Sequence, residues 1–435
     1  MYKESMVKRL SKLVQWAQTL PNDIRWAFAD SALYQSIDHG KRITRGSRGR
    51  ILSFILRASQ KVKIEWLAIL GVAFYEAAKM WRAYQKPDTY CSKDVEPHIF
   101  VGFGAGMEEE LFRIFAEDRR GVFRADQQRL ESFNVDHEMR LKDVFRTVLQ
   151  SLGRLKNEWP TLPLDAHEYR VEFLTHLTMR VARYCFFRTW FECYTKALGR
   201  APEVCLISPD TLAFAAVDAG VISDFYQHGL MRLSGVFPDF TRVRALTADE
   251  ASYLQKALPR SVIRSALPIA KPIENTRDRV VLVASIYGSV SQMNIVIPFL
   301  EWADAAGMTI LVRRHPKEQS DYWSSLSPRF RLTIDDRNEP IAKVFTRVRP
   351  AIVVSWFSTA MVDALNYGLI PVMLVPNDDD AVRDLIYPLV TRTLNWPNDK
   401  VQIDKALRSS AARGAIIRTL KAQGNQSHPQ TLFSY

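Results

Sequence analysis

The chain has 435 residues, of which 47% are hydrophobic and 24% charged, and it carries a net charge of +12 at pH 7. This composition is ordinary for a globular protein and excludes an intrinsically disordered chain. At roughly 150 residues per domain, the length predicts two or three domains. The first 90 residues hold 16 Lys or Arg against 7 Asp or Glu, so most of the basic excess is N-terminal. An anionic membrane surface or another polyanion is the partner expected for residues 1–90. A basic solubilising face is the alternative.

The number and spacing of the cysteines and the lengths of the apolar runs indicate where in the cell the protein is located. The four cysteines form no CxxC pair and no dense framework, which fits a reduced intracellular protein. The N-terminus lacks the apolar core of a signal peptide. The longest apolar run, residues 66–74, is well short of the ~20 residues that a spanning helix needs. We therefore expect a cytoplasmic protein.

Residues 1–86 are predicted to form helices. Residues 6–20 place Met6, Leu10, Leu13 and Leu20 near one helical face, with lysines opposite. Such a helix can lie in a membrane interface or dock on the body of the protein. The basic, glycine-containing residues 39–50 are predicted to contact lipid phosphates or an acidic polymer, or else to serve as a connector.

The middle of the chain begins an α/β pattern. Residues 98–103 are predicted as a strand that leads through a glycine-rich turn into a helix, which are the parts of a phosphate or substrate cradle. The spacing is not that of a dinucleotide site. Residues 140–200 are predicted to be helical, residues 203–208 to form a strand, and residues 269–279 to form a linker.

Strands and helices alternate regularly after this linker, which predicts a parallel sheet. Two α/β halves joined by a linker favour a bilobal enzyme with a cleft. The expected strands of the second half are 280–285, 308–313, 331–335, 351–355 and 370–375, and the expected helices are 293–307, 340–348 and 358–368.

Hydroxyl groups gather after one of these strands. Ser355, Ser358 and Thr359 lie between a buried strand and a helix start, where hydroxyls and free backbone N–H groups form an anion site. Asp363 follows one turn into the helix, within reach of a ribose or an amide. The alternative for Ser358 is a purely structural N-cap.

Two further loops follow strands of the same predicted sheet. The first carries Ser285, Gly288 and Ser289. The second is a basic cluster around His315, and its alternative is a solvated charged turn. Because the carboxyl ends of parallel strands meet at one edge, where ligands bind, the three loops are predicted to converge on a diphosphate or a nucleotide monophosphate. The residues of the basic cluster are Arg313, Arg314, His315, Pro316 and Lys317.

One histidine of the first half also lies beside a glycine. His228 precedes Gly229, so it can approach a substrate closely and act as a general base near neutral pH. The alternative is an ordinary helix-end histidine.

The order of these motifs resembles a known family. Gln227-His228-Gly229, then Arg314-His315-Pro316, then residues 335–376 are similar to the GT-B glycosyltransferases of bacterial surface (capsule or lipopolysaccharide) polysaccharides. These include capsule-type sialyl- and Kdo-transferases and the CDP-glycerol polymerases of teichoic acid synthesis. The resemblance covers roughly residues 203–376, and residues 1–95 carry none of it.

The resemblance implies a fold and a division into domains. It implies an α/β protein with two Rossmann-like lobes of GT-B type and an N-terminal helical region. Residues 1–95 would form the basic helical region, and residues 96–270 an acceptor-side lobe with a helical insertion. Residues 277–425 would form the nucleotide-sugar-binding lobe.

The resemblance also implies roles for single residues. His315 would contact the donor phosphate and assist the leaving group, with Ser358 and Thr359 on the same phosphate. His228 would be the acceptor-side base or a substrate contact. Glu108 is the nearest acidic candidate for a base, although acids at a helix start can simply complement the macrodipole. Residues expected to line the acceptor side are Gln227, Gly229, Gly104 and Gly106.

Two departures from the family pattern bear on the donor. Teichoic acid polymerases usually have Asp-Tyr-Ser-Ser where this chain has Ser355-Trp356-Phe357-Ser358, which weakens a CDP-polyol donor. The acidic pair followed by glycine of polysialyltransferases is not evident.

The expected function is transfer of a sugar, with a CMP-linked donor favoured, to a growing surface polysaccharide or a lipid-linked acceptor. We expect no metal and no cofactor, because cationic side chains, hydroxyls and a helix N-terminus can neutralise the leaving phosphate. The basic N-terminal helices would hold the enzyme peripherally at the inner membrane. One alternative is a CDP-polyol phosphotransferase. The second is a non-catalytic binder of polyanions or nucleic acid, which the absence of a known groove-reading module disfavours.

Overall fold

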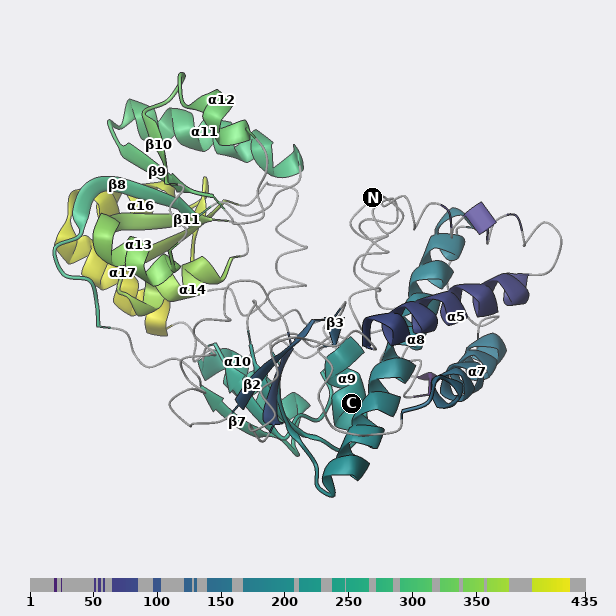
Figure 1. Cartoon of the computed structure of the whole chain (residues 1–435). Coiled ribbons are helices and arrows are strands. Elements are labelled where there is room, and N and C mark those ends of the chain that lie inside the picture. Colours follow the sequence, from purple (N-terminus) through teal and green to yellow (C-terminus); the bar gives the residue numbers. More distant parts are fainter. Residues whose placement is uncertain are drawn as a thin grey trace.

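The computed structural model describes two β-sheets and the helices packed on them (Figure 1). The residues that it describes are 19–21, 25, 51, 54, 55, 58, 65–84, 97–102, 121–126, 129–130, 139–158, 167–206, 211–227, 237–246, 248–265, 271–284, 290–314, 321–335, 339–355, 358–374 and 393–422.

The first sheet has seven strands in the order β3-β2-β1-β4-β5-β6-β7. All neighbours are parallel except β2 and β3, which form an antiparallel edge. The order reverses direction between β1 and β4. The strands are β1 (Pro97–Gly102), β2 (Gly121–Asp126), β3 (Arg129–Leu130), β4 (Glu203–Leu206), β5 (Ile222–Tyr226), β6 (Arg242–Ala245) and β7 (Val262–Ser265).

The second sheet has six strands, all parallel, in the order β10-β9-β8-β11-β12-β13. Numbered along this half of the chain, the order is 3-2-1-4-5-6, that of a doubly wound sheet. The strands are β8 (Arg277–Ala284), β9 (Thr309–Arg313), β10 (Leu332–Asp335), β11 (Pro350–Ser355), β12 (Ile370–Leu374) and β13 (Leu394–Trp396).

Helices cover both faces of the second sheet, which explains its nearly continuous apolar strands. Successive side chains of a strand point to opposite faces, so Val281 and Val283 join one core, whereas Leu282 and Ala284 join the other. The first core is closed by α11 (Val290–Ala305), α12 (Tyr322–Leu326), α16 (Lys400–Arg408) and α17 (Ser410–Ala422), and the second mainly by α13 (Ile341–Val348) and α14 (Thr359–Asn366).

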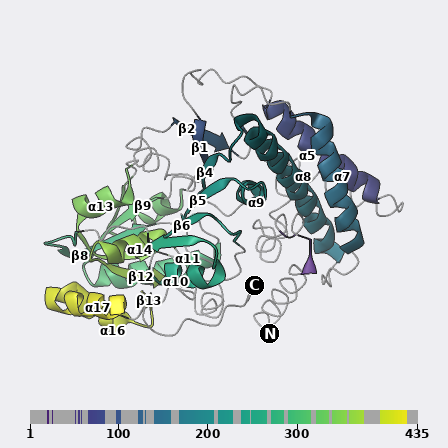
Figure 2. The same ribbon diagram turned by 90° about the horizontal axis from the view of Figure 1, so that it is seen from below.

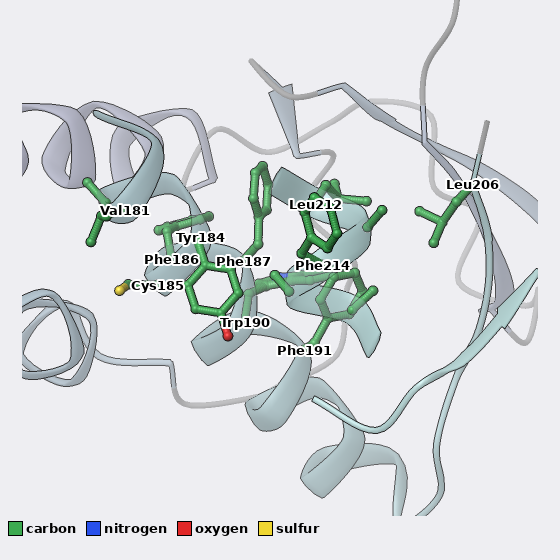
Figure 3. Close-up of a cluster of buried hydrophobic side chains, with 14 of the residues drawn as sticks. Val181, Tyr184, Cys185, Phe186, Phe187, Trp190, Phe191, Leu206, Leu212 and Phe214 are labelled. Atoms are coloured by element: carbon green, nitrogen blue, oxygen red, sulfur yellow. The ribbon is translucent and has the colours of Figure 1, made fainter. Parts of the chain in front are cut away.

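Three long helices pack side by side next to the first sheet (Figure 2). They are α5 (Glu65–Tyr84), α7 (Leu141–Glu158) and α8 (His167–Leu198), and the shorter α9 (Thr211–Asp218) and α10 (Ala248–Ala257) lie against the strands. Figure 3 shows the aromatic run of α8 packed against α9. Tyr184, Phe187 and Trp190 are fully buried there, so the middle of α8 is an interior helix that joins the helical layer to the sheet.

The structure confirms the predicted fold class of two α/β lobes. Residues 140–200 form α7 and α8 as expected, and residues 66–74 lie within α5. None of the helices in these described segments is long and apolar enough to cross a bilayer. Residues 6–18, expected as a helix on the membrane or on the protein body, lie outside the described residues. So do residues 39–50, expected as a phosphate-contacting segment or a connector. The domain boundaries at 95, 270 and 277 stay predictions.

Other expectations needed adjustment. The expected linker, 269–279, ends early, because β8 already begins at Arg277. The strand expected at 331–335 is β10, which begins one residue later at Leu332 and ends at the buried Asp335. The strands β2, β3, β5, β6, β7 and β13 were not anticipated.

A buried ion pair ties α5 to α8. The Glu76 carboxylate is 1% exposed, and the Nε of Arg183 donates to it at 2.6 Å, with Lys79 at 3.5 Å. A carboxylate taken out of water needs such partners, because an unpaired buried charge is strongly unfavourable.

We predict that Arg183→Ala lowers the free energy of unfolding by about 3 kcal/mol, because it strips a buried carboxylate of its main partner. The matched control is Arg329→Ala, since the Arg329–Glu301 pair has the same 2.6 Å separation but is more than half exposed. That change should cost less than about 1 kcal/mol. Scanning calorimetry of both variants makes the comparison, and equal losses would contradict the prediction.

Candidate active site

The carboxyl ends of the second sheet lie at one edge, because all its strands are parallel. Ala284 pairs with Arg313, and Arg313 with Asp335, so the ends of β8, β9 and β10 are level. Strand β11 runs beside β8 and ends at Ser355. The strand order reverses between β8 and β11, and ligands of doubly wound sheets bind outside such a switch point. The strand ends Ala284 and Ser355, after which the sequence predicts two of the three loops, both lie there.

Ser355 ties the two strands of this switch point together. Its side chain is fully buried, and its Oγ donates to the carbonyl oxygen of Ala284 at 2.6 Å. The hydroxyl proton is therefore already used within the protein. A phosphate-binding role for Ser355 stays a prediction.

Ser358 is the N-cap of α14. Its backbone is extended, with φ −104° and ψ 144°, and its Oγ accepts from the backbone N–H of Ala360 at 3.2 Å. Ser358 therefore has the N-cap role that was the structural alternative in the sequence analysis. Thr359 is the first residue of the helix, and Asp363 lies one turn further on; both are half-buried. The positive end of the α14 dipole therefore lies at Thr359, four residues after Ser355, the last residue of β11.

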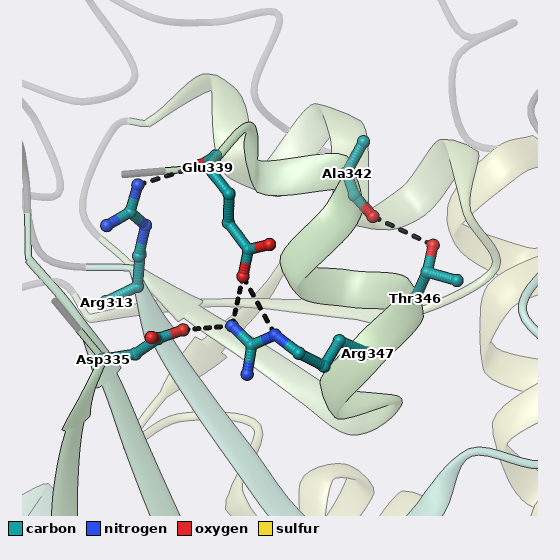
Figure 4. A network of polar contacts seen from close by, with 6 residues as sticks. All are labelled: Arg313, Asp335, Glu339, Ala342, Thr346 and Arg347. Carbon is teal, nitrogen blue, oxygen red and sulfur yellow. Dashed lines mark hydrogen bonds and ion pairs between the residues drawn. The ribbon is translucent and has the colours of Figure 1, made fainter. Parts of the chain in front are cut away.

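A network of charged side chains lies on the other side of β8 (Figure 4). Arg347 of α13 donates to Asp335, the last residue of β10, and its Nε donates to Glu339 at 2.9 Å. The hydrogen bond with Glu339, followed by that with Asp335, raises the pKa of Arg347, so it is charged at any physiological pH. Arg313 is half-buried, and its Nη2 donates to the backbone carbonyl of Glu339 at 2.9 Å. The network fixes the end of β9, just before Arg314 and His315.

In the first sheet, Gln227 follows β5 and is almost fully buried. Its Nε2 donates to the buried Glu250 carboxylate of α10 at 2.7 Å, and its Oε1 accepts from the backbone N–H of Leu246 at 3.1 Å. Its own backbone N–H donates to the Arg244 carbonyl at 3.0 Å. Gln227 therefore anchors the strand end immediately before His228.

The remaining predicted site residues lie outside the described residues. They are Gly104, Gly106, Glu108, His228, Gly229, Ser285, Gly288, Ser289, His315, Pro316 and Lys317. Their roles stay predictions. Of the predicted residues that are described, the structure places Arg313, Arg314, Ser355, Ser358, Thr359 and Asp363 at or next to the carboxyl edge of the second sheet.

The sequence did not single out Glu250, Glu339 or Arg347. Asp335 was expected only as the last residue of a strand. The signal for Arg347 was weak, since it lies eight residues after Glu339 on a helix whose other residues are apolar on one face. Among the residues that the structure describes, no three His, Cys, Asp or Glu side chains are grouped to hold a metal ion.

A family model described as alpha-2,8-polysialyltransferase matches residues 220–375. The match is just over a third of the chain and runs from β5 to the end of β12, so it contains His228, His315 and the loop before α14. No curated protein matches the chain.

Several solved structures are similar in fold. UDP-GlcNAc 2-epimerase of Methanocaldococcus jannaschii, in complex with UDP-GlcNAc and UDP, has a TM-score of 0.42 at 11% identity and covers 74% of this chain and 99% of that chain. UGT2 of Phytolacca americana, complexed with UDP-2fluoro-glucose and pterostilbene, has a TM-score of 0.39 at 11% identity, over 77% and 95%. The glycosyltransferase VinC, in complex with DTDP, has a TM-score of 0.38 at 11% identity, over 75% and 95%.

Likenesses at these TM-scores do not indicate a substrate for this chain. The family match, taken with the two Rossmann-like lobes, supports a glycosyltransferase enzyme, and that prediction from the sequence is confirmed.

We predict that Ser355→Ala lowers the free energy of unfolding by about 1–3 kcal/mol, because it leaves the buried Ala284 carbonyl without its donor. Calorimetry measures the loss. A control is Ser325→Ala on α12, whose Oγ also donates to a carbonyl, at 2.7 Å, but is exposed. That change should stay within about 0.5 kcal/mol. A neutral Ser355→Ala would show that the strand tie contributes nothing.

Proposed function

We propose that the chain transfers a sugar from a nucleotide-sugar donor to a bacterial surface polysaccharide or a lipid-linked acceptor, without a metal ion. The observation that carries this proposal is the switch point of the second sheet. It brings the ends of β8 and β11 together next to the N-terminus of α14, with Arg313 and Arg314 at the end of the neighbouring β9.

The chemistry of the donor side follows from charge. When the sugar leaves, negative charge grows on the departing nucleotide phosphate, and fixed positive groups in a site sheltered from water stabilise it. In the proposal the N-terminus of α14, the Arg314 guanidinium and the basic stretch containing Lys317 supply that charge. His315 contacts the same phosphate and assists the leaving group.

The acceptor side of the proposal belongs to the first sheet. His228 accepts the proton of the attacking acceptor hydroxyl, or else contacts the substrate, and the described contacts of Gln227 hold the strand end from which it projects. Glu108 is the alternative base.

A CMP-linked donor is the favoured choice. The family model is named for a polysialyltransferase, and the motif order resembles sialyl- and Kdo-transferases. The competing reaction is transfer of a polyol phosphate from a CDP donor, which would use the same residues. Membrane association through the basic residues 1–90 belongs to the proposal as well, since it would bring the enzyme to lipid-linked acceptors.

We predict that CMP raises the melting temperature of the wild type, whereas UDP and GDP do not. A ligand at 100 times its Kd adds about 2.7 kcal/mol of apparent stability. His315→Ala should abolish the shift. A uridine or guanosine preference would leave the enzyme class intact and remove the CMP-linked donor, and no shift by any nucleotide would contradict the proposed site. Product analysis with CMP-sugar and CDP-polyol donors then separates sugar transfer from polyol phosphate transfer.

A matched pair of arginines tests where the phosphate binds. Arg314 follows the carboxyl end of β9, and Arg331 precedes the amino end of β10, at the opposite edge of the sheet. We predict that Arg314→Ala weakens nucleotide binding by about tenfold or more, as expected for the loss of a hydrogen bond to a charged group. Arg331→Ala should leave it unchanged. Isothermal titration measures both, and an equal effect of the two changes would count against the carboxyl edge.

The two roles of Ser358 can be separated. We predict that Ser358→Gly retains stability to within a few tenths of a kcal/mol, because glycine is tolerated at an N-cap, whereas Ser358→Ala costs about 1 kcal/mol. If the hydroxyl also binds the donor phosphate, Ser358→Gly still weakens nucleotide binding. Unchanged affinity in Ser358→Gly would mean that Ser358 only caps α14.

A further inference from the structure

Exposed apolar side chains gather in a short N-terminal stretch. Of the eight large hydrophobic side chains that are exposed in the described part of the chain, five lie between residues 51 and 75. Phe54 is 72% exposed, Ile51 59% and Ile55 43%. Single exposed hydrophobic residues are ordinary, but a cluster of them marks an interaction surface.

The spacing of these residues makes the surface continuous. Residues 51, 54, 55 and 58 are helical and exposed. Their spacing of i, i+3, i+4 and i+7 places them along one side of a helix. We call Ile51, Phe54, Ile55 and Ala58 the apolar stripe. Leu67 and Tyr75 of α5 are also exposed, with the exposed Gly71 midway between them, so that one face of α5 carries a second, shorter apolar row.

The charge around the apolar stripe has a single sign. Residues 39–64 contain eight Lys or Arg and no Asp or Glu. This segment alone therefore holds two thirds of the net charge of the chain. In the sequence, Arg50 directly precedes Ile51 and Arg57 directly precedes Ala58. Long basic side chains beside an apolar stripe can keep their charges in water while their stems lie on apolar material.

We infer that the apolar stripe is a membrane-docking surface that inserts into the interface of an anionic bilayer, with the surrounding basic residues on the lipid phosphates. An apolar row flanked by Lys and Arg is the composition of helices that lie in the plane of a membrane. A nucleic acid or an acidic polysaccharide would attract the same charge, but neither would bury two isoleucines and a phenylalanine. This inference deepens the membrane association proposed for residues 1–90 and assigns it to four residues.

The test is sedimentation of the full chain with vesicles of phosphatidylcholine alone and of equal parts phosphatidylcholine and phosphatidylglycerol. The wild type should bind the anionic vesicles, and salt should weaken that binding because basic residues contribute to it. Phe54→Ser should reduce the partition coefficient by about tenfold, as expected for the loss of one large apolar side chain from the interface. Phe54→Trp should retain binding, since tryptophan favours this region of a bilayer.

The matched control is Val401→Ser on α16 of the second lobe, because that side chain is 67% exposed and also has basic neighbours, Lys400 and Lys405, but is the single exposed large hydrophobic residue of its helix. It should bind as the wild type does. The inference is overturned if the wild type does not bind anionic vesicles, or if Phe54→Ser and Val401→Ser behave alike. It is also overturned if Phe54→Ser converts a dimer into a monomer in light scattering, since the stripe would then join two copies of the chain.

Activity separates this inference from the proposed function. With a donor and an acceptor free in solution, Phe54→Ser should transfer sugar as fast as the wild type, because the apolar stripe contributes nothing to the switch point. Wild-type vesicle binding without any transfer would refute the proposed reaction alone, and transfer without vesicle binding would refute the docking surface alone.

Discussion

The parallel pairing of β8 with β11 is the constraint on which the candidate site depends. These strands are neighbours in the sheet and run parallel, so both of them end at the same edge, although they are far apart in the chain. Their register brings the Ser355 hydroxyl to the Ala284 carbonyl, and this buried hydrogen bond holds the two strand ends together. The N-terminus of α14 follows β11 at this edge, which in doubly wound sheets is the edge where ligands bind.

Most strands of the second lobe could be predicted from the sequence because they are buried on both faces. Segments such as Val280–Ala284 and Ala351–Val354 are apolar without interruption, and they leave little choice of secondary structure. Strands β5 and β6 gave no such signal, since one of their faces carries charge. Asp224 pairs across the strands with Arg242, and burial raises the pKa of Asp224 even though Arg242 opposes the shift. Alternating apolar and charged residues over only four or five positions also fit a loop or a helix end.

The site itself was predictable in its position but not in its internal contacts. The three hydroxyl residues at and after the end of β11 were recognised as a group. In the structure, however, Ser355 donates a hydrogen bond to the neighbouring strand and Ser358 caps a helix. Both tasks depend on partners that the sequence does not reveal, namely a carbonyl 71 residues away and a backbone N–H that is free only at a helix start. The pairing of Arg347 with Asp335 was missed for the same reason, because it requires the relative placement of α13 and β10.

The two lobes hold their functional loops in a similar way. Loops make few contacts of their own, so a side chain that must stand at a fixed place depends on the element from which it projects. In the first lobe Gln227 fixes the end of β5 through Glu250 and the Leu246 N–H, directly before His228. In the second lobe Arg313 fixes the end of β9 through the Glu339 carbonyl, directly before Arg314 and His315. In both cases a polar side chain one or two residues before the proposed catalytic histidine is bound to the protein, so the strand end that precedes the histidine is held in place.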